Sequence, residues 1–221
     1  MDTLEALYTT RAMRRVTTEP VPEDVQAAIL DAAIRAPSGG NTQNWRFLLV
    51  DEPEVKGAIG PLYRDSIEQL WATVYAERLA AAAADPEDPE SAQMVKVQRS
   101  AQWLADHFEE VPLFLFGFVQ HDPSGGSIYP AVWSAMLAAR THGVGSSLTS
   151  VLGFFHPKET LEILGVPDGE GWIMACCVSF GYPTGRWGVA GRRPVHEVSY
   201  RNRWGAPVGF EVPEALWSPA R

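Results

Sequence analysis

The sequence predicts a mixed α+β fold, built as one domain over residues 1–221. Three observations support this prediction: several segments have apolar residues at helical spacing, other short segments are uninterrupted apolar runs of strand length, and no linker is long enough to separate two domains. A chain of this length can bury roughly 70–75% of the surface that its unfolded form exposes. It therefore needs no covalent cross-links to be stable.

Helices are expected where apolar residues recur every three or four positions. The first begins at Pro22, which suits a first helical position and is followed by two acidic residues. The expected helices span residues 22–35, 59–84, 95–108, 131–142 and 157–164. The helix over 131–142 has no polar face, which is typical of a helix deep in a core or in a subunit interface.

Strands are expected at three apolar runs, over residues 45–50, 112–119 and 172–180. The middle run, Pro-Leu-Phe-Leu-Phe-Gly-Phe-Val, has no polar residue, which predicts a strand buried on both faces. Residues 85–91 (Asp-Pro-Glu-Asp-Pro-Glu-Ser) are an acidic break with two prolines and are expected to form a mobile surface segment. From Pro207 onward we expect an extended tail.

The charge balance argues against two classes of partner. The chain has 18 Lys+Arg against 27 Asp+Glu, a net charge of −9, so we expect no sequence-independent binding to nucleic acid or to an anionic membrane. The arginines are unevenly placed, however: residues 1–15 and 186–203 are net basic, whereas residues 16–185 are strongly acidic. The two ends of the chain are therefore where a local anion site is expected.

The sequence also predicts a soluble, cytoplasmic protein. Its start has no basic segment followed by an apolar core, and no stretch reaches 18 uninterrupted apolar residues. The only cysteines, Cys176 and Cys177, are adjacent, which disfavours a structural disulfide and fits a reducing compartment. The histidines are scattered singly, so no metal site is expected.

Common catalytic motifs are absent from the sequence. It contains no Walker A loop, HExxH, CxxC or GxSxG. Residues 143–147 (Gly-Val-Gly-Ser-Ser) begin like a dinucleotide-binding fingerprint, but they follow a helix instead of a strand and lack the third glycine. A Rossmann site is therefore not expected.

Three polar clusters in the sequence indicate what kind of ligand the protein binds. Residues 11–15 (Arg-Ala-Met-Arg-Arg) form either a solvated helix end or a phosphate clamp, since the guanidinium fork binds phosphate oxygens bidentately. Residues 36–45 (Ala-Pro-Ser-Gly-Gly-Asn-Thr-Gln-Asn-Trp) form either an ordinary helix-to-strand loop or one that reads the edge of a planar heterocycle. Residues 191–194 (Gly-Arg-Arg-Pro) form a charged turn or a second half of the clamp. Together the clusters describe a ligand with a phosphate and a polar-edged ring.

At these clusters the sequence resembles the FMN-dependent nitroreductase family. The resemblance runs nearly end to end, from residues 10–15 through 36–47 to 192–194 and 203–205, and Pro-Ser-Gly-Gly-Asn-x-Gln-x-Trp is its most specific stretch. It implies a nitroreductase-like three-layer fold, with a central, mostly antiparallel sheet flanked by helices. It also implies an interlocked homodimer that holds one FMN in each of two interface sites. The helix over 131–142 would then meet the partner subunit.

The resemblance also implies which residues hold FMN. One subunit would supply the basic ends of the chain, its partner would supply the loop after the first predicted helix, and a third stretch would flank the flavin ring and present backbone groups to it. The residues implied are Arg11, Met13, Arg14, Arg15 and Arg192 or Arg193 for the clamp, Pro37, Ser38 and Gly39 from the other subunit, Leu148, Thr149 and Ser150 beside the ring, and Asn41 and Gln43 near the ring or supporting that loop. The sequence departs from the family at Ala12, where a serine is frequent, and at Asn44, where a proline is frequent. The first departure loses a hydroxyl contact, and neither removes a named ligand.

The activity implied is that of an FMN-dependent oxidoreductase. It would take a hydride from NADH or NADPH and reduce nitroaromatics, quinones or similar acceptors in a ping-pong cycle. FMN carries the redox chemistry in such an enzyme, so no catalytic residue is assigned. Two alternatives stay open: another flavin reaction on the same fold (dehalogenation, flavin cleavage or ring oxidation), and a flavin-binding protein without catalysis. Substrate choice is expected to involve Tyr63, Trp71, Trp103 and residues 85–91, with helical core as the alternative for the three aromatic residues.

Overall fold

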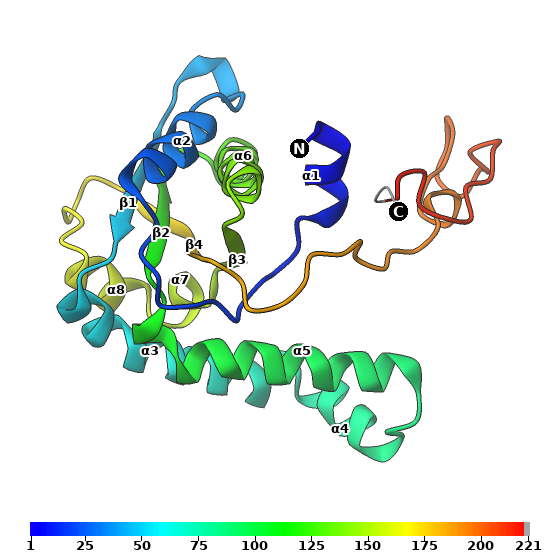
Figure 1. The fold of residues 1–221 in the computed structure, drawn as a ribbon, viewed down its shortest axis with the longest axis horizontal. Helices are drawn as coiled ribbons and strands as arrows, with labels where there is room; N and C mark the ends of the chain where they lie inside the picture. Colours follow the sequence, from blue (N-terminus) through cyan, green and yellow to red (C-terminus); the bar gives the residue numbers. More distant parts are fainter. Residues whose placement is uncertain (219–221) are drawn as a thin grey trace.

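The computed structural model describes residues 1–218 and has a four-stranded sheet at its centre (Figure 1). The strands lie in the order β1–β2–β4–β3, and each neighbouring pair is antiparallel. They are β1 (Trp45–Val50), β2 (Leu113–Val119), β3 (Gly145–Thr149) and β4 (Ile173–Gly181). The expected α+β fold with an antiparallel central sheet is confirmed.

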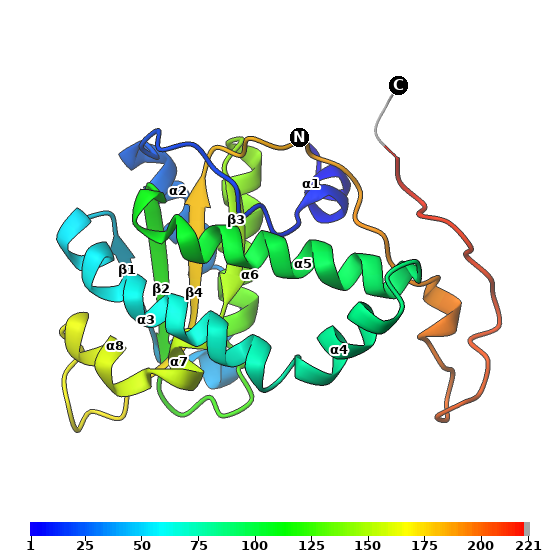
Figure 2. The ribbon, with the colours of Figure 1, turned by 90° about the horizontal axis from the view of Figure 1, so that it is seen from below.

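Helices cover both faces of the sheet (Figures 1 and 2). On one face, α2 (Glu23–Ala33) and α6 (Ile128–Thr141) share a hydrophobic core with the strands. On the other, α3 (Pro53–Ala72), α5 (Pro89–Asp106) and α7 (Val151–Phe155) build a second core. The remaining elements are α1 (Thr3–Thr9), α4 (Ala76–Ala84), α8 (Pro157–Ile163) and the short 3-10 helices η1 (Gly39–Asn41), η2 (Phe108–Glu110) and η3 (Val195–Glu197).

The three strands expected from apolar runs are confirmed, and β2 is buried along its whole length. Besides the short 3-10 helices, three elements were not expected, namely α1, α7 and the short, polar β3. The single helix expected over 59–84 is wrong, because α3 already begins at Pro53 and the chain breaks between Ala72 and Ala76. The acidic break is also shorter than expected, since Pro89 sits in the first turn of α5.

The N-terminal segment runs along the free edge of the sheet. Met13 N–H donates to the Ser146 carbonyl in β3 at 2.9 Å, and Thr17 N–H donates to the Tyr182 carbonyl just after β4 at 2.8 Å. In return, Thr184 N–H donates to the Arg15 carbonyl at 3.0 Å. These bonds fix the first basic cluster beside the segment that leads to the second.

Arg140 in α6 ties the N-terminal helix to the chain that follows the sheet. Its side chain is buried, its Nε donates to Thr9 Oγ1 at 3.0 Å, and its Nη2 lies 3.7 Å from a Glu5 carboxylate oxygen. Its guanidinium also stacks at 4.0 Å on the ring of Trp187. Beyond that residue the chain leaves the sheet (Figure 2).

The C-terminal segment carries several large apolar side chains on its surface. Trp204 is 92% exposed and Leu216 is 82% exposed. From Pro207 to Ser218 there is no helix or strand, as expected for a tail, and residues 219–221 lie outside the described part of the chain. Within residues 1–218, no helix is long and apolar enough to cross a bilayer.

Candidate functional site

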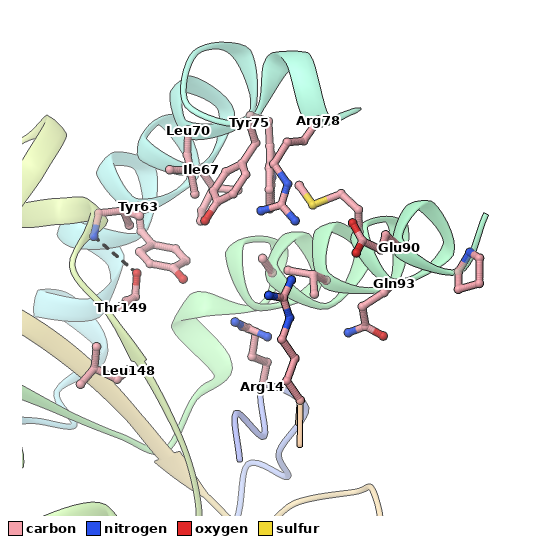
Figure 3. Close-up of a pocket in the computed structure, with 17 residues that line it drawn as sticks. Arg14, Tyr63, Ile67, Leu70, Tyr75, Arg78, Glu90, Gln93, Leu148 and Thr149 are labelled. Atoms are coloured by element: carbon pink, nitrogen blue, oxygen red, sulfur yellow. Dashed lines mark hydrogen bonds between the residues drawn. The ribbon is translucent and has the colours of Figure 1, made fainter. Parts of the chain in front are cut away.

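A pocket of about 500 Å³ opens between the edge of the sheet and the helices α3, α4 and α5 (Figure 3). It brings together the two basic ends of the chain, since Arg14 and Arg193 both line it. The end of β3 contributes Leu148 and Thr149, and α7 contributes Val151. The helical wall is mainly apolar and aromatic and consists of Tyr63, Ile67, Leu70, Trp71, Tyr75, Arg78, Pro89, Glu90, Gln93, Met94, Val97 and Ala101.

Arg14 is a half-buried cation without an anionic partner. Its Nη1 donates only a long hydrogen bond to Ser100 Oγ, at 3.4 Å, and no carboxylate of residues 1–218 lies within 4.0 Å of it. Burial lowers the pKa of this guanidinium below its ordinary value, but an arginine remains charged in proteins. A charge that is partly removed from water without a partner favours an anionic ligand.

The inner end of the pocket adds polar groups that carry no charge. Burial raises the pKa of the Tyr63 phenol well above its ordinary value, so this side chain stays neutral at physiological pH. The Thr149 hydroxyl accepts a 3.4 Å hydrogen bond from Val151 N–H, which is the dashed line in Figure 3. Further out, beside Tyr75, Trp71 has a buried indole N–H for which the described residues provide no acceptor. A ligand that reaches this end therefore meets hydrogen-bonding groups in an apolar surrounding.

The other residues of the two basic clusters lie nearby but do not line this pocket. Arg11 Nη2 donates to the Arg186 carbonyl at 2.8 Å, and Met13 is buried against β3. Arg15 is exposed and lies 5.8 Å above the Trp103 ring. Arg192 donates to the Gly191 carbonyl and borders a separate hollow beside α1.

The loop over residues 37–43 lies outside the pocket of its own chain. Its backbone is strained: Asn41 and Gln43 have φ values of 54° and 52°, in the left-handed region that few side chains adopt. The strained turn is held by Ser38 Oγ, which accepts from Gln43 N–H at 3.2 Å, while Gly39 N–H donates to Ser127 Oγ at 3.3 Å. Pro37, Gly39, Asn41 and Gln43 are all exposed.

The residues expected to flank a ring or to select a substrate fall in different places. Ser150 does not join Leu148 and Thr149 but borders another hollow, with Phe154. Trp103 is also outside the pocket, because it stacks on His107 with their centroids 4.2 Å apart. Tyr63, Trp71 and the last residues of the acidic break do line the pocket.

The sequence did not single out three further residues of the wall, Tyr75, Arg78 and Gln93. They line the pocket although each falls in an ordinary helical pattern. Their place becomes visible only in the structure, where α4 follows the break at residues 73–75 and packs against α5 (Figure 2).

The sequence of the chain matches a known protein family. A family model described as the nitroreductase family matches residues 7–182. The chain therefore belongs to the nitroreductase family.

Particular relatives differ in what they are described to do. The chain is 27% identical over 210 residues to an NADH dehydrogenase of Thermus thermophilus, covering 90% of this chain and 95% of that protein. It is 29% identical over 197 residues to the 5,6-dimethylbenzimidazole synthase of Rhodospirillum rubrum, covering 82% of each. The family alone therefore does not define the reaction.

Solved structures agree on the fold. The FMN- and NADPH-dependent nitroreductase NfnB from Sphigopyxis sp. strain HMH, solved as a variant, superposes with a TM-score of 0.67 at 22% identity, covering 92% of this chain and all of that one. Oxidised iodotyrosine deiodinase bound to FMN and 3-iodo-L-tyrosine gives a TM-score of 0.65 at 20% identity, covering 92% and 98%. At these identities the likeness shows the fold alone.

Proposed function

We propose that the protein is an FMN-dependent oxidoreductase that takes a hydride from NADH or NADPH and reduces a nitroaromatic, quinone or similar acceptor. The observation that carries the proposal is the pocket in which two arginines without carboxylate partners among the described residues, Arg14 and Arg193, adjoin an apolar and aromatic wall. FMN combines the two matching features, a phosphate and a planar ring.

The residues present fit such a ligand. Guanidinium groups bind phosphate oxygens through paired, charge-assisted hydrogen bonds, and a pocket of about 500 Å³ is in the ordinary range for cofactor sites. The half-buried Arg14 gains most from an anion, because it is the one partly removed from water. Two relatives support the assignment by description: NfnB is FMN-dependent, and iodotyrosine deiodinase is bound to FMN.

We infer that the site is completed by a second copy of the chain. The loop over residues 37–43 is exposed, strained and outside its own chain's pocket, as a loop that serves a partner's site would be. Large apolar side chains also remain on the surface of the chain, including Trp133 on α6 at 39% exposure and Phe154 at 72%. Analytical ultracentrifugation should therefore show a homodimer, and a monomer at micromolar concentration would contradict the shared site.

The chemistry divides between the cofactor and the chain. Bound FMN supplies the ability to accept a hydride and to release two electrons. For a nitro acceptor the balance is R–NO2 + NAD(P)H + H+ giving R–NO + NAD(P)+ + H2O, and for a quinone the product is the hydroquinone. Arg14 and Arg193 would bind the cofactor, Leu148 and Thr149 would line the space that it enters, and the apolar wall of α3 and α5 would exclude water from that space.

A second candidate is another flavin reaction in the same pocket. It is favoured by the likeness to a 5,6-dimethylbenzimidazole synthase and by iodotyrosine deiodinase relatives, one of them 36% identical over 75 residues. Stopped-flow mixing of the flavin-loaded protein with NADH or NADPH separates the candidates. Rapid bleaching of the flavin, followed by steady turnover of a nitroaromatic or quinone, supports the proposed oxidoreductase. Bleaching without such turnover indicates the second candidate, and no bleaching indicates a flavin-binding protein without this activity.

A further inference from the structure

The outer wall of the pocket holds a third cation, set apart from Arg14 and Arg193. Arg78 projects from α4 toward the pocket that it lines (Figure 3). Its guanidinium lies 5.8 Å from the centroid of the Tyr75 ring, within the range of a cation–π contact. Within residues 1–218 it makes no ion pair and no hydrogen bond, so its charge-assisted donors are free.

The surface next to Arg78 suits a flat aromatic ring. Trp71 and Tyr75 stand side by side with centroids 5.3 Å apart and ring planes at 48° to each other. Met94 and Val97 from α5 line the facing wall, and methionine sulfur and aromatic rings pack favourably. The arrangement thus places a free cation at the edge of an aromatic and apolar surface.

One carboxylate, that of Glu90, also lines the pocket, so positive and negative charge lie at different places around it. Glu90 projects from α5 into the same space as Arg78 in Figure 3, yet the two do not form an ion pair. A negatively charged group on a bound ring is attracted toward α4 and repelled from the first turn of α5. The pocket therefore distinguishes the two ends of a ring that carries a single anionic group.

We propose that this outer wall selects acceptors that carry an anionic group, such as a carboxylate, on their aromatic ring, and that Arg78 is the residue that determines this specificity. The inference rests on the proposed function and names the substrate class of the same pocket. Arg78 binds the anionic group, while Trp71 and Tyr75 pack against the ring. The fork of the guanidinium matches the two oxygens of a carboxylate.

The test compares two acceptors that differ in charge and hardly in shape, 4-nitrobenzoate and 4-nitrobenzamide. For each enzyme the ratio of kcat/KM for the anionic over the neutral acceptor is measured with the flavin-loaded protein, so that their different reduction potentials cancel when enzymes are compared. Arg78→Gln should lower this ratio about 10-fold or more, the effect of losing a hydrogen bond to a charged group. Glu90→Gln should raise it. Arg99→Gln is the matched control, because Arg99 is exposed on α5 and does not line the pocket.

A binding measurement makes the test independent of turnover. Binding of 4-hydroxybenzoate and 4-hydroxybenzamide, which the enzyme does not reduce, is followed by the change in the absorbance of bound flavin. Arg78→Gln should weaken binding of the anion and not of the amide. If neither nitro acceptor is turned over by the wild-type protein, the proposed function fails while this titration still decides the role of Arg78.

Two results would overturn the inference. One is an unchanged anion-to-neutral ratio in Arg78→Gln, in turnover and in binding. The other is a loss that falls on NADPH relative to NADH and leaves both acceptors unaffected, because Arg78 would then serve the phosphate of the hydride donor.

Discussion

The position of Gly145 offers a direct way to disturb the basic clusters without touching an arginine. A Cβ at this residue would lie 2.9 Å from Met13 Cβ and 3.3 Å from Pro183 Cβ. Carbon atoms pack at about 3.5–4.0 Å, so Gly145→Ala requires the N-terminal segment to retreat by about 0.6–1.1 Å. The clashing atom, Met13 Cβ, is bonded directly to the backbone, so it can move only if the backbone of Met13 moves.

Two consequences should follow from Gly145→Ala. Overpacking of this kind costs about 1–3 kcal/mol, and it also strains the 2.9 Å hydrogen bond from Met13 N–H to the Ser146 carbonyl. We therefore expect the free energy of unfolding in urea to fall by that amount. Because Arg14 follows Met13 directly, FMN affinity should fall as well, by about 1 kcal/mol or more, the worth of one hydrogen bond.

Gly57→Ala is the matched control for this experiment. Its added Cβ meets nothing within 4 Å and it lies in α3, where alanine is favoured over glycine by about 0.8–1.0 kcal/mol. Its stability should equal or exceed that of the wild type, with FMN affinity unchanged. If Gly145→Ala matches the wild type in both measurements, the N-terminal segment is not packed on β3 as described. If only stability falls, the segment does not position the cofactor.

Three further predictions concern single groups. Arg140→Met should lower the free energy of unfolding by about 1–3 kcal/mol, because it removes a buried charged hydrogen bond; the exposed Arg35→Met, measured in the same urea titration, should stay close to wild type. Burial raises the pKa of the Cys176 thiol to about 12 and raises that of the Cys177 thiol well above its ordinary value. Ellman's reagent at pH 8 should therefore label neither thiol in the native protein and both in urea, and fast labelling of the native protein would contradict their burial. A hydrogen bond from His156 lowers the pKa of the Asp65 carboxyl below its ordinary 3.8. The Asp65 carboxylate therefore stabilises the fold above pH 3.8, and this stabilisation is lost as the pH falls through the pKa that Asp65 has in the folded protein. The difference in melting temperature between wild type and Asp65→Asn should thus shrink between pH 6 and pH 3, and a difference that grows would refute this.

The sequence predicts those helices and strands whose structure follows from their own residues and does not depend on distant parts of the chain. The apolar run in β2 is buried whichever neighbours it has, and it was predicted within one residue of Leu113–Val119. The sequence of β3, Gly-Ser-Ser-Leu-Thr, has little apolar content. It is a strand because its backbone pairs with β4, which is a tertiary effect. The sequence does not predict the break between α3 and α4, because apolar residues continue across it.

The residues of the candidate site likewise include some that the sequence predicts and others that only the tertiary structure brings to the pocket. Arginine clusters at the two ends of the chain predicted an anion site formed by distant segments, and Arg14 and Arg193 do line one pocket. The outer wall depends on how α4 packs against α5, so nothing local to Arg78 indicates that it faces the same space. Trp103 shows the reverse, since its aromatic ring suggested a substrate contact and instead packs on His107.

The central claim is that Arg14 and Arg193 together hold FMN. Its most direct test is an equilibrium titration of the flavin-free protein with FMN, followed by quenching of flavin fluorescence, for the wild type, Arg14→Ala, Arg193→Ala and the exposed control Arg99→Ala. We predict that each pocket variant loses about 1–3 kcal/mol of FMN binding free energy, the scale of a hydrogen bond to a charged group, and that Arg99→Ala loses none. Equal FMN affinity in all four proteins, or no FMN binding by the wild type, would contradict the claim.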